Sequence, residues 1–569
     1  MTGWLPLLLV LSLMETAWSQ EEAGPSDQIE IESTLTEATP LSEAEELLAT
    51  GQAHLDEAEW DEAIADLNEA IKRQPDLAAA YYSRGVAYNG KGNHKAAIAD
   101  LSVAIKNDPS ADAYYERGIA QRRVGAKDEA LKDISQALDL SPDHLMARME
   151  RAEVLESTGS FDEAMKDLDA AHKLDDQNPT VYWERAMLFN RRKEYDRAIA
   201  ETDRLLEINP NYKPLYSARG IAYSRRGQDD QAIESFTKAI EQDQQWQEDH
   251  SATSDSVRRE LEKDWANDYA DRAMAYGAKN DLSSAISDLS EAIRHKPDDP
   301  EFYHWRGTLY KRTRQFNKAI EDLSRAIELD PSKAEPYSER AYCHNESDEY
   351  EQAVVDCDAA LRLDPKFEPA FETRGYAHLQ RKEYDAAVAD LSEAIKLDPP
   401  GIWALNVRGR AYNMQEKLDE ALADFDEAIR RKPQETAPLF NRSRVYTKQK
   451  QYNKALADLR RVKEINGKAV SALNSLAWLL ATCPDRTIRD GKQAVQDART
   501  VCDLTNWGDE AYIDTLAAAC AEQGDFDTAI KFQEQAVAML SKTDPRHADM
   551  ESRVALFKKR QPYRTPAGP

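Results

Sequence analysis

The sequence predicts an all-α fold, an α-solenoid of stacked antiparallel helix pairs, and three observations support this prediction. Residues 61–67 (DEAIADL) recur at a spacing of 34 residues, as in 95–101 (KAAIADL). Each copy follows an aromatic, glycine-bearing stretch such as 81–88 and precedes a proline. Charged residues make up 31% of the chain and aromatic ones only 8%, a composition typical of helices. Self-similarity at this period indicates units that bury their apolar faces against their neighbours.

Small residues mark both predicted helices of each unit, because they let two helix backbones approach closely. They lie in the middle of the first helix (Gly51, Gly85, Gly118, Gly220, Gly307, Gly375 and Gly409) and near the start of the second (Ala63, Ala97, Ala319, Ala387 and Ala421). An apolar residue follows four positions after each of these alanines and extends a helical stripe. Proline then ends the second helix at 75, 109, 142, 210, 297, 331, 365, 399 and 433.

These small, aromatic, alanine and proline positions resemble the tetratricopeptide repeat family over most of the chain. The resemblance implies a right-handed superhelix whose first helices line the concave side. We expect twelve units in 42–467, two divergent helix pairs in 468–541, and a capping helix and tail in 542–569. The capping helix should have Asp544 as its N-cap and Pro545 in its first turn, and should place Met550, Val554 and Phe557 on one face.

An insertion at 245–265 lengthens the link between the sixth and seventh units. Its second half, 257–265, contains good helix formers and no helix breaker. We therefore expect these residues to continue into the seventh first helix, with a loop at 251–256.

The N-terminal residues predict an exported protein. Residues 1–19 carry a short apolar run followed by small residues, which is typical of a cleaved signal peptide. The run is too short to span a bilayer, so we expect no membrane span in the mature chain. Residues 20–41 form an acidic linker without apolar periodicity. The protein thus looks like an exported bacterial member of the family, periplasmic or secreted.

The sequence argues against an enzyme and against a nucleic-acid-binding protein. A net charge of −30 and a pI near 4.9 disfavour phosphate binding. No segment remains for a catalytic domain, and we see no glycine-rich phosphate loop and no short His and Cys spacing for a metal. We therefore expect no cofactor and no metal. The five cysteines, at 343, 357, 483, 502 and 520, should remain buried free thiols.

The leading functional hypothesis is a scaffold that binds a protein or peptide partner in its concave groove. Two alternatives stay open: a regulator or assembly factor that positions a separate catalytic chain, and a purely structural spacer. Fold alone does not choose among them.

The candidate partner-binding residues are aromatic anchors and arginines or lysines of the first helices. Tyr82, Tyr115, Met149 and Trp183 occupy the same position in successive units. Cations lie near the ends of first helices, namely Arg122, Arg123, Arg191, Arg192, Arg225, Arg226, Lys311 and Arg312. Aromatic anchors beside arginines suit a segment with apolar and acidic residues.

A second recurring pattern predicts a ladder of ion pairs. Most units carry Arg just before the small residue of the first helix and Asp just before the apolar residue of the second. We expect each acid to pair with the arginine of the next unit, as Asp66 with Arg84.

Overall fold

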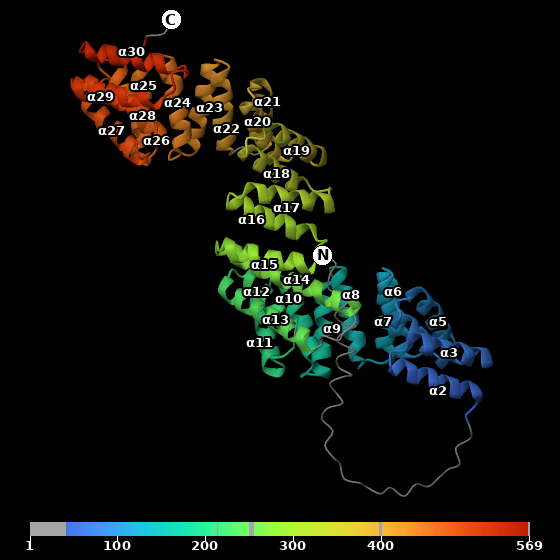
Figure 1. The fold of residues 1–569 in the computed structure, drawn as a ribbon. Helices are drawn as coiled ribbons and strands as arrows, with labels where there is room; N and C mark the ends of the chain where they lie inside the picture. The colour runs from blue at the N-terminus through green and yellow to red at the C-terminus, as the bar shows by residue number, and fades with distance from the viewer. Residues whose placement is uncertain (1–40, 213, 250–254, 398–400, 567–569) are drawn as a thin grey trace. The chain divides into compact units, whose positions relative to one another are not determined.

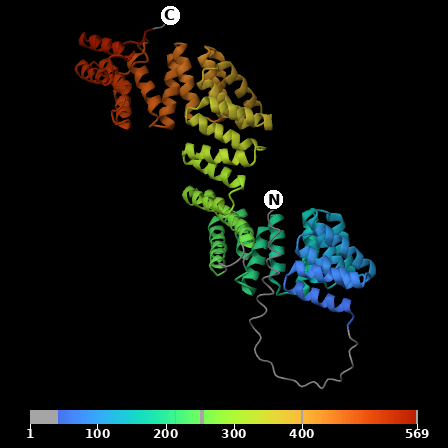
Figure 2. The same cartoon turned by 45° about the vertical axis from the view of Figure 1, so that its right-hand side comes forward.

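The computed structural model describes residues 41–212, 214–249, 255–397 and 401–566, which form helices and connecting turns without a strand (Figure 1). The fold is all-α, as predicted. The chain divides into two compact units, 1–302 and 303–569. Within each unit, antiparallel helix pairs follow one another along the chain, as a second view also shows (Figure 2).

The first unit consists of seven helix pairs. In chain order its helices are α2 (Glu43–Asp56), α3 (Trp60–Arg73), α4 (Ala78–Gly90), α5 (His94–Asn107), α6 (Ala111–Arg123), α7 (Lys127–Leu140), α8 (Leu145–Ser157), α9 (Phe161–Leu174), α10 (Pro179–Arg191), α11 (Tyr195–Ile208), α12 (Pro214–Arg225), α13 (Asp229–Asp249), α14 (Asp255–Ala278) and α15 (Leu282–His295).

The second unit begins within α16 (Pro300–Arg312). Its further helices are α17 (Phe316–Leu329), α18 (Ala334–Glu346), α19 (Tyr350–Leu363), α20 (Glu368–Gln380), α21 (Tyr384–Leu397), α22 (Ile402–Met414), α23 (Leu418–Arg431), α24 (Thr436–Lys448), α25 (Tyr452–Ile465), α26 (Val470–Thr482), α27 (Gly491–Leu504), α28 (Glu510–Gln523), α29 (Phe526–Met539) and α30 (His547–Lys558).

The small residues bring the two helices of a pair into contact. A Cβ built on Gly85 in α4 would lie 2.6 Å from Cγ of Leu101 in α5, and one on Gly409 would lie 2.7 Å from Cε1 of Phe425. Leu101 and Phe425 are fully buried. Since a real Cβ atom does not tolerate such distances, a side chain at these glycines would push the helices apart.

The ion-pair ladder exists, but the predicted partners were wrong. Arg84 binds Asp100 of its own pair, with Nε–Oδ2 at 2.6 Å and Nη2–Oδ1 at 2.8 Å, instead of Asp66. The same bidentate pairing recurs sixteen residues apart for Arg117, Arg151, Arg272, Arg306, Arg340, Arg374, Arg408 and Arg442. Gly85 and Leu101, which meet where the two helices cross, are also sixteen residues apart. Arg84 directly precedes Gly85 and Asp100 directly precedes Leu101, so the hairpin places Arg84 opposite Asp100.

The ladder arginines also connect neighbouring pairs, through a residue that the sequence analysis did not consider. Nη1 of Arg374 lies 2.5 Å from Asp358 of the preceding second helix, and Nη1 of Arg408 lies 2.9 Å from Ser392. One guanidinium group thus binds the aspartate of its own helix pair through Nε and Nη2, and a side chain of the preceding pair through Nη1. This geometry uses the fixed donor fork that distinguishes arginine from lysine.

The turn inside most of the described helix pairs contains one residue with positive φ, and the longer link between α26 and α27 is the exception. Gly92, Gly125 and Gly159 take this role in the second, third and fourth pairs. Non-glycine residues adopt the same backbone conformation in later pairs, at Arg314, Asp348, Lys382, Glu416 and Lys450. The left-handed conformation costs an L-residue about 1 kcal/mol, so these turns store a small strain that the glycine turns avoid.

The insertion is helical on both sides of residues 250–254, which lie outside the described residues. As predicted, residues 257–265 belong to α14, which continues as the seventh first helix. Asp255 and Ser256 were expected in the loop but are already helical, and α13 extends through Asp249. Good helix formers adjoin the ends of the insertion, so both flanking helices elongate into it.

The last helix, α30, begins at His547, and its N-cap is Arg546 and not Asp544. Asp544 instead accepts hydrogen bonds from the backbone and side-chain nitrogens of Arg546, in the turn before the helix. Met550, Val554 and Phe557 are buried on one face, as expected.

Two further expectations concern the cysteines and the chain ends. All five cysteines are buried and free. No described helix combines the length and apolar character that a membrane crossing requires. The expected signal peptide and almost all of the linker lie outside the described residues.

Candidate functional site

The first helices of neighbouring pairs lie on one side of the stack in each unit. Most consecutive first helices contact each other, as α18 contacts α20 and α22 contacts α24, whereas consecutive second helices make no comparable contact in the described chain. The side on which helices approach more closely is the inner side of a curved stack. We call the side formed by α4, α6, α8 and α10 the N-terminal face, and that formed by α18, α20, α22 and α24 the C-terminal face.

The predicted aromatic anchors lie on the N-terminal face but are covered to different degrees. Tyr82 and Tyr115 are half-buried, and burial raises the pKa of both phenols. Met149 and Trp183 are buried, with exposed fractions of only 7% and 6%. Trp183 packs among Tyr182, Met187 and other apolar residues of its own and the following pair. Met149 and Trp183 thus contribute to the core of this unit.

The predicted arginines of the N-terminal face already have acidic partners. Arg122, with 9% of its side chain exposed, forms ion pairs with Glu150 and, at 2.8 Å, with Glu153 on the next first helix. Arg191 forms an ion pair with Glu156 of the preceding first helix. These arginines therefore hold neighbouring repeats together, and their use for a partner stays a prediction.

The remaining predicted cations of the first unit follow the same tendency. Arg192 pairs with Asp162 at 2.6 Å and with Glu194 at 2.7 Å, and Arg226 pairs with Asp196 at 2.7 Å. Arg123 is half-buried, and burial together with the neighbouring charge of Arg122 lowers the pKa of Arg123. Arg225 is exposed at the end of α12.

Acidic residues dominate the inner side of the N-terminal face. Burial raises the pKa of Glu116 and Glu150, and burial together with Glu153 and Glu156 raises the pKa of Glu184 to about 8. One carboxylate oxygen of Glu156 has no hydrogen-bond partner. The carboxylates named here outnumber the arginines, so the predicted arginines of this face lie among acidic residues.

In the second unit, Lys311 and Arg312 lie at the end of α16. Lys311 pairs with Glu339 of α18 at 2.7 Å, and its ammonium lies 5.9 Å from the centre of the Tyr342 ring. Burial opposes ionisation of Glu339, but a hydrogen bond from His304 and the charge of Lys311 lower its pKa to about 2. Arg312 is exposed.

The C-terminal face carries a row of residues that the sequence analysis did not select. Each directly follows the small residue of its first helix, and the row reads Tyr342, Tyr376, Arg410 and Arg444. Tyr342 and Arg444 are exposed, whereas Tyr376 and Arg410 are half-buried. Alignment of the first helices on their small residues would have revealed this row, because its members are spaced by 34 residues.

A further aromatic residue lies beside the row. Trp403, at the start of α22, has 45% of its surface exposed, and its ring centre lies 5.8 Å from that of Tyr376. Two aromatic rings in contact on neighbouring helices, one of them exposed, are typical of a binding surface.

The chain's own C-terminal tail covers the next position of the row. Trp478 on α26 lies against Tyr563 of the tail, with ring centres 5.8 Å apart. The backbone nitrogen of Thr565 donates to the carbonyl oxygen of Thr482 at 2.9 Å, and the two hydroxyl groups lie 2.7 Å apart. A non-helical segment is therefore held against first helices at this end of the row.

The described residues offer no metal site, because they contain no group of three or more ligating side chains. Burial raises the pKa of the thiols of Cys502 and Cys520 to about 11, which leaves them protonated and unreactive at neutral pH.

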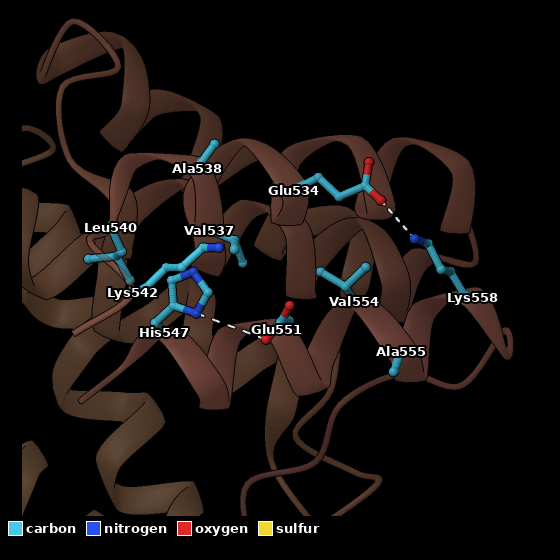
Figure 3. A pocket seen from close by; sticks show the side chains of 10 residues that line it. All are labelled: Glu534, Val537, Ala538, Leu540, Lys542, His547, Glu551, Val554, Ala555 and Lys558. Atoms are coloured by element: carbon cyan, nitrogen blue, oxygen red, sulfur yellow. Dashed lines mark ion pairs between the residues drawn. The ribbon is translucent and has the colours of Figure 1, made fainter. Parts of the chain in front are cut away.

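An open groove lies between α29 and α30 (Figure 3). Val537, Leu540 and Val554 form its apolar part. Lys558 pairs with Glu534 across it at 2.8 Å, while His547 lies 3.9 Å from Glu551.

Comparison with known proteins agrees with the repeat pattern. Family models of the tetratricopeptide repeat match residues 48–112, 115–179, 214–245, 300–333, 372–436 and 407–470, together just over half of the chain. No curated protein sequence matches the chain.

Solved structures give weaker similarity. Cut9-Hcn1, an APC/C hetero-tetramer, is 15% identical, with 84% of this chain and 96% of that chain covered and a TM-score of 0.42. Yeast Tom70 is 18% identical, with 85% and 96% covered and a TM-score of 0.29. MamA is 25% identical, with 30% and 92% covered and a TM-score of 0.28. Scores this low do not establish a common overall arrangement, so the repeat sequence itself carries the assignment.

Proposed function

Because the chain belongs to the tetratricopeptide repeat family, we propose that it is a non-catalytic scaffold that holds a segment of a partner protein on its C-terminal face. The observation that carries this proposal is the row Tyr342, Tyr376, Arg410 and Arg444 with Trp403 beside it. Aromatic residues and arginine are the side chains that most often dominate binding energy at protein interfaces.

The C-terminal tail supports the same mode of binding. Its Tyr563 lies on Trp478, which continues the row by one repeat, and its backbone donates to a first-helix carbonyl group. The contacts of the described tail residues with first helices are with α26 and α28, which lie beyond the four helices of the C-terminal face.

Site-specific photo-crosslinking tests the proposal. A photoreactive amino acid replaces Tyr376 in one full-length variant and Val355 in another; Val355 is 65% exposed on the second helix α19 and serves as the control for the outer surface. In an extract of the organism's own cells, we expect a discrete crosslinked protein from position 376 and none from position 355. Equal crosslinking at both positions, or crosslinking at position 355 alone, would contradict a partner site on the C-terminal face.

We further propose that the chain is exported after removal of residues 1–19, on the basis of the leader-like sequence alone. N-terminal sequencing of the protein secreted or released from the periplasm should begin at Gln20. A mature protein that retains Met1 would exclude cleavage.

A further inference from the structure

Arg410 and Arg444 differ from most other arginines of the first helices. Neither forms a hydrogen bond or ion pair with any residue that the structure describes. Two positions earlier, Arg408 and Arg442 each hold an aspartate of their own pair in two hydrogen bonds. The two arginines thus occupy the same position of consecutive repeats, in a chain whose net charge is −30.

The two arginines lie at equivalent positions of α22 and α24, which contact each other. Burial lowers the pKa of Arg410, and the neighbouring charge of Arg444 lowers it further. Two like charges on adjacent helices, one of them half-buried, raise the free energy of the unoccupied face. An anion between them would remove this repulsion.

The surroundings indicate what kind of anion fits. Tyr376 and Trp403 lie on the same side, with Trp403 exposed, so a ligand that reaches both arginines also meets apolar surface. Carboxylates match the planar donor fork of arginine, and aromatic or aliphatic side chains match the rings. A protein segment supplies both kinds of group at short spacing.

We propose that Arg410 and Arg444 form an acid-binding centre that selects a partner segment carrying carboxylates next to an apolar residue. This inference rests on the proposed scaffold function and specifies which partner the C-terminal face accepts. A nucleic acid is the less suitable occupant, because two cations on a strongly acidic protein do not provide the clustered positive charge that a phosphate backbone requires.

Fluorescence anisotropy with purified full-length protein tests the proposal. The probe is a short fluorescein-labelled peptide in which Glu and Phe alternate, and a matched peptide carries Gln in place of Glu. The test variant is R410Q/R444Q. The control variant R430Q/R461Q removes the same charge from exposed arginines of second helices, which pair only within their own helices.

We expect the wild type to bind the acidic peptide about tenfold more tightly than the Gln peptide, and R410Q/R444Q to lose about tenfold in affinity. The control should bind like the wild type. Binding of the acidic peptide should weaken as salt concentration rises.

Equal affinity of the wild type and R410Q/R444Q for the acidic peptide would overturn the inference. Tighter binding of a single-stranded oligonucleotide than of the acidic peptide, lost in R410Q/R444Q, would overturn it in favour of a nucleic acid. The crosslinking experiment distinguishes failure of the acid-binding centre from failure of the scaffold function. If both the wild type and R410Q/R444Q crosslink a partner at position 376, the scaffold function is supported and the acid-binding centre is rejected. A crosslink at position 355 alone rejects the scaffold site.

Discussion

The N-terminal and C-terminal faces are built from the same repeat, yet they use charge differently. On the N-terminal face, Arg122 is covered and held by Glu150 and Glu153 of the next helix. On the C-terminal face, Arg410 and Arg444 have no ion-pair partner among the described residues, and aromatic rings lie beside them. A cation on a first helix therefore stabilises the stack in one region and remains available to an acidic ligand in the other. Side-chain type alone does not distinguish these roles.

The largest expected effect comes from breaking a pair of the N-terminal face. Arg122→Ala leaves Glu150 buried without its counter-charge and should cost about 3 kcal/mol. Arg410→Ala removes a half-buried charge without a partner and should be neutral or slightly stabilising. Urea denaturation, with amide exchange of α6 and α22 as local probes, measures both. Similar losses of unfolding free energy in Arg122→Ala and Arg410→Ala would show that the arginines of the two faces do not differ in their contribution to stability.

The ladder should contribute equally in both regions, because its geometry is the same in both. Asp133→Asn and Asp390→Asn should each lower the free energy of unfolding by about 2 kcal/mol. A double-mutant cycle for Arg374 and Asp390 should give a coupling energy above about 1 kcal/mol, and one for Arg374 and Asp356 about zero. The opposite ranking would restore the pairing between units that the sequence analysis predicted.

Two glutamates at the same repeat position should respond to pH in opposite directions. The folded pKa of Glu184 is about 8, above its ordinary 4.5, so its ionisation opposes folding. Its penalty is absent below pH 4.5, grows as pH rises toward 8, and is full above that value. The folded pKa of Glu339 is about 2, so its contribution is present above pH 4.5 and is lost as pH falls toward 2.

Accordingly, Glu184→Gln should stabilise the protein by about 1–3 kcal/mol near pH 9 and leave it unchanged near pH 4. Glu339→Gln should destabilise it by about 1–2 kcal/mol near pH 7. Denaturant titrations across this pH range measure both effects. If Glu184→Gln instead destabilises the protein at high pH, the Glu184 carboxylate of the wild type has a stabilising partner in the folded state.

The smallest expected effect concerns the turns inside the pairs. Lys382→Gly relieves a left-handed backbone conformation at φ 64° and should stabilise the second unit by up to about 1 kcal/mol. Gly125→Lys introduces that strain at φ 84° and should destabilise the first unit by about 1 kcal/mol. Thermal unfolding measures the two shifts, and shifts of the same sign in both variants would contradict the explanation.

Local pattern was sufficient to predict the helix pairs and their core. Gly85 and Ala97 identify where two helices meet, since only small side chains fit there. The continuation of residues 257–265 into α14 followed from helix propensity, and the buried face of α30 from its period. The first turn of α30 was placed two residues too early, because Asp544 binds Arg546 in a turn and the N-cap is Arg546.

Only the tertiary structure decided which charges find partners. The sequence determined that the chain is a stack of tetratricopeptide-type pairs, because each pair repeats the same short-range spacing of small and apolar residues. It did not determine that Arg84 binds Asp100 and not Asp66, or that Arg122 is covered while Arg444 is exposed. An ion pair depends on the distance between groups on different helices, and the packing of one pair against the next sets that distance.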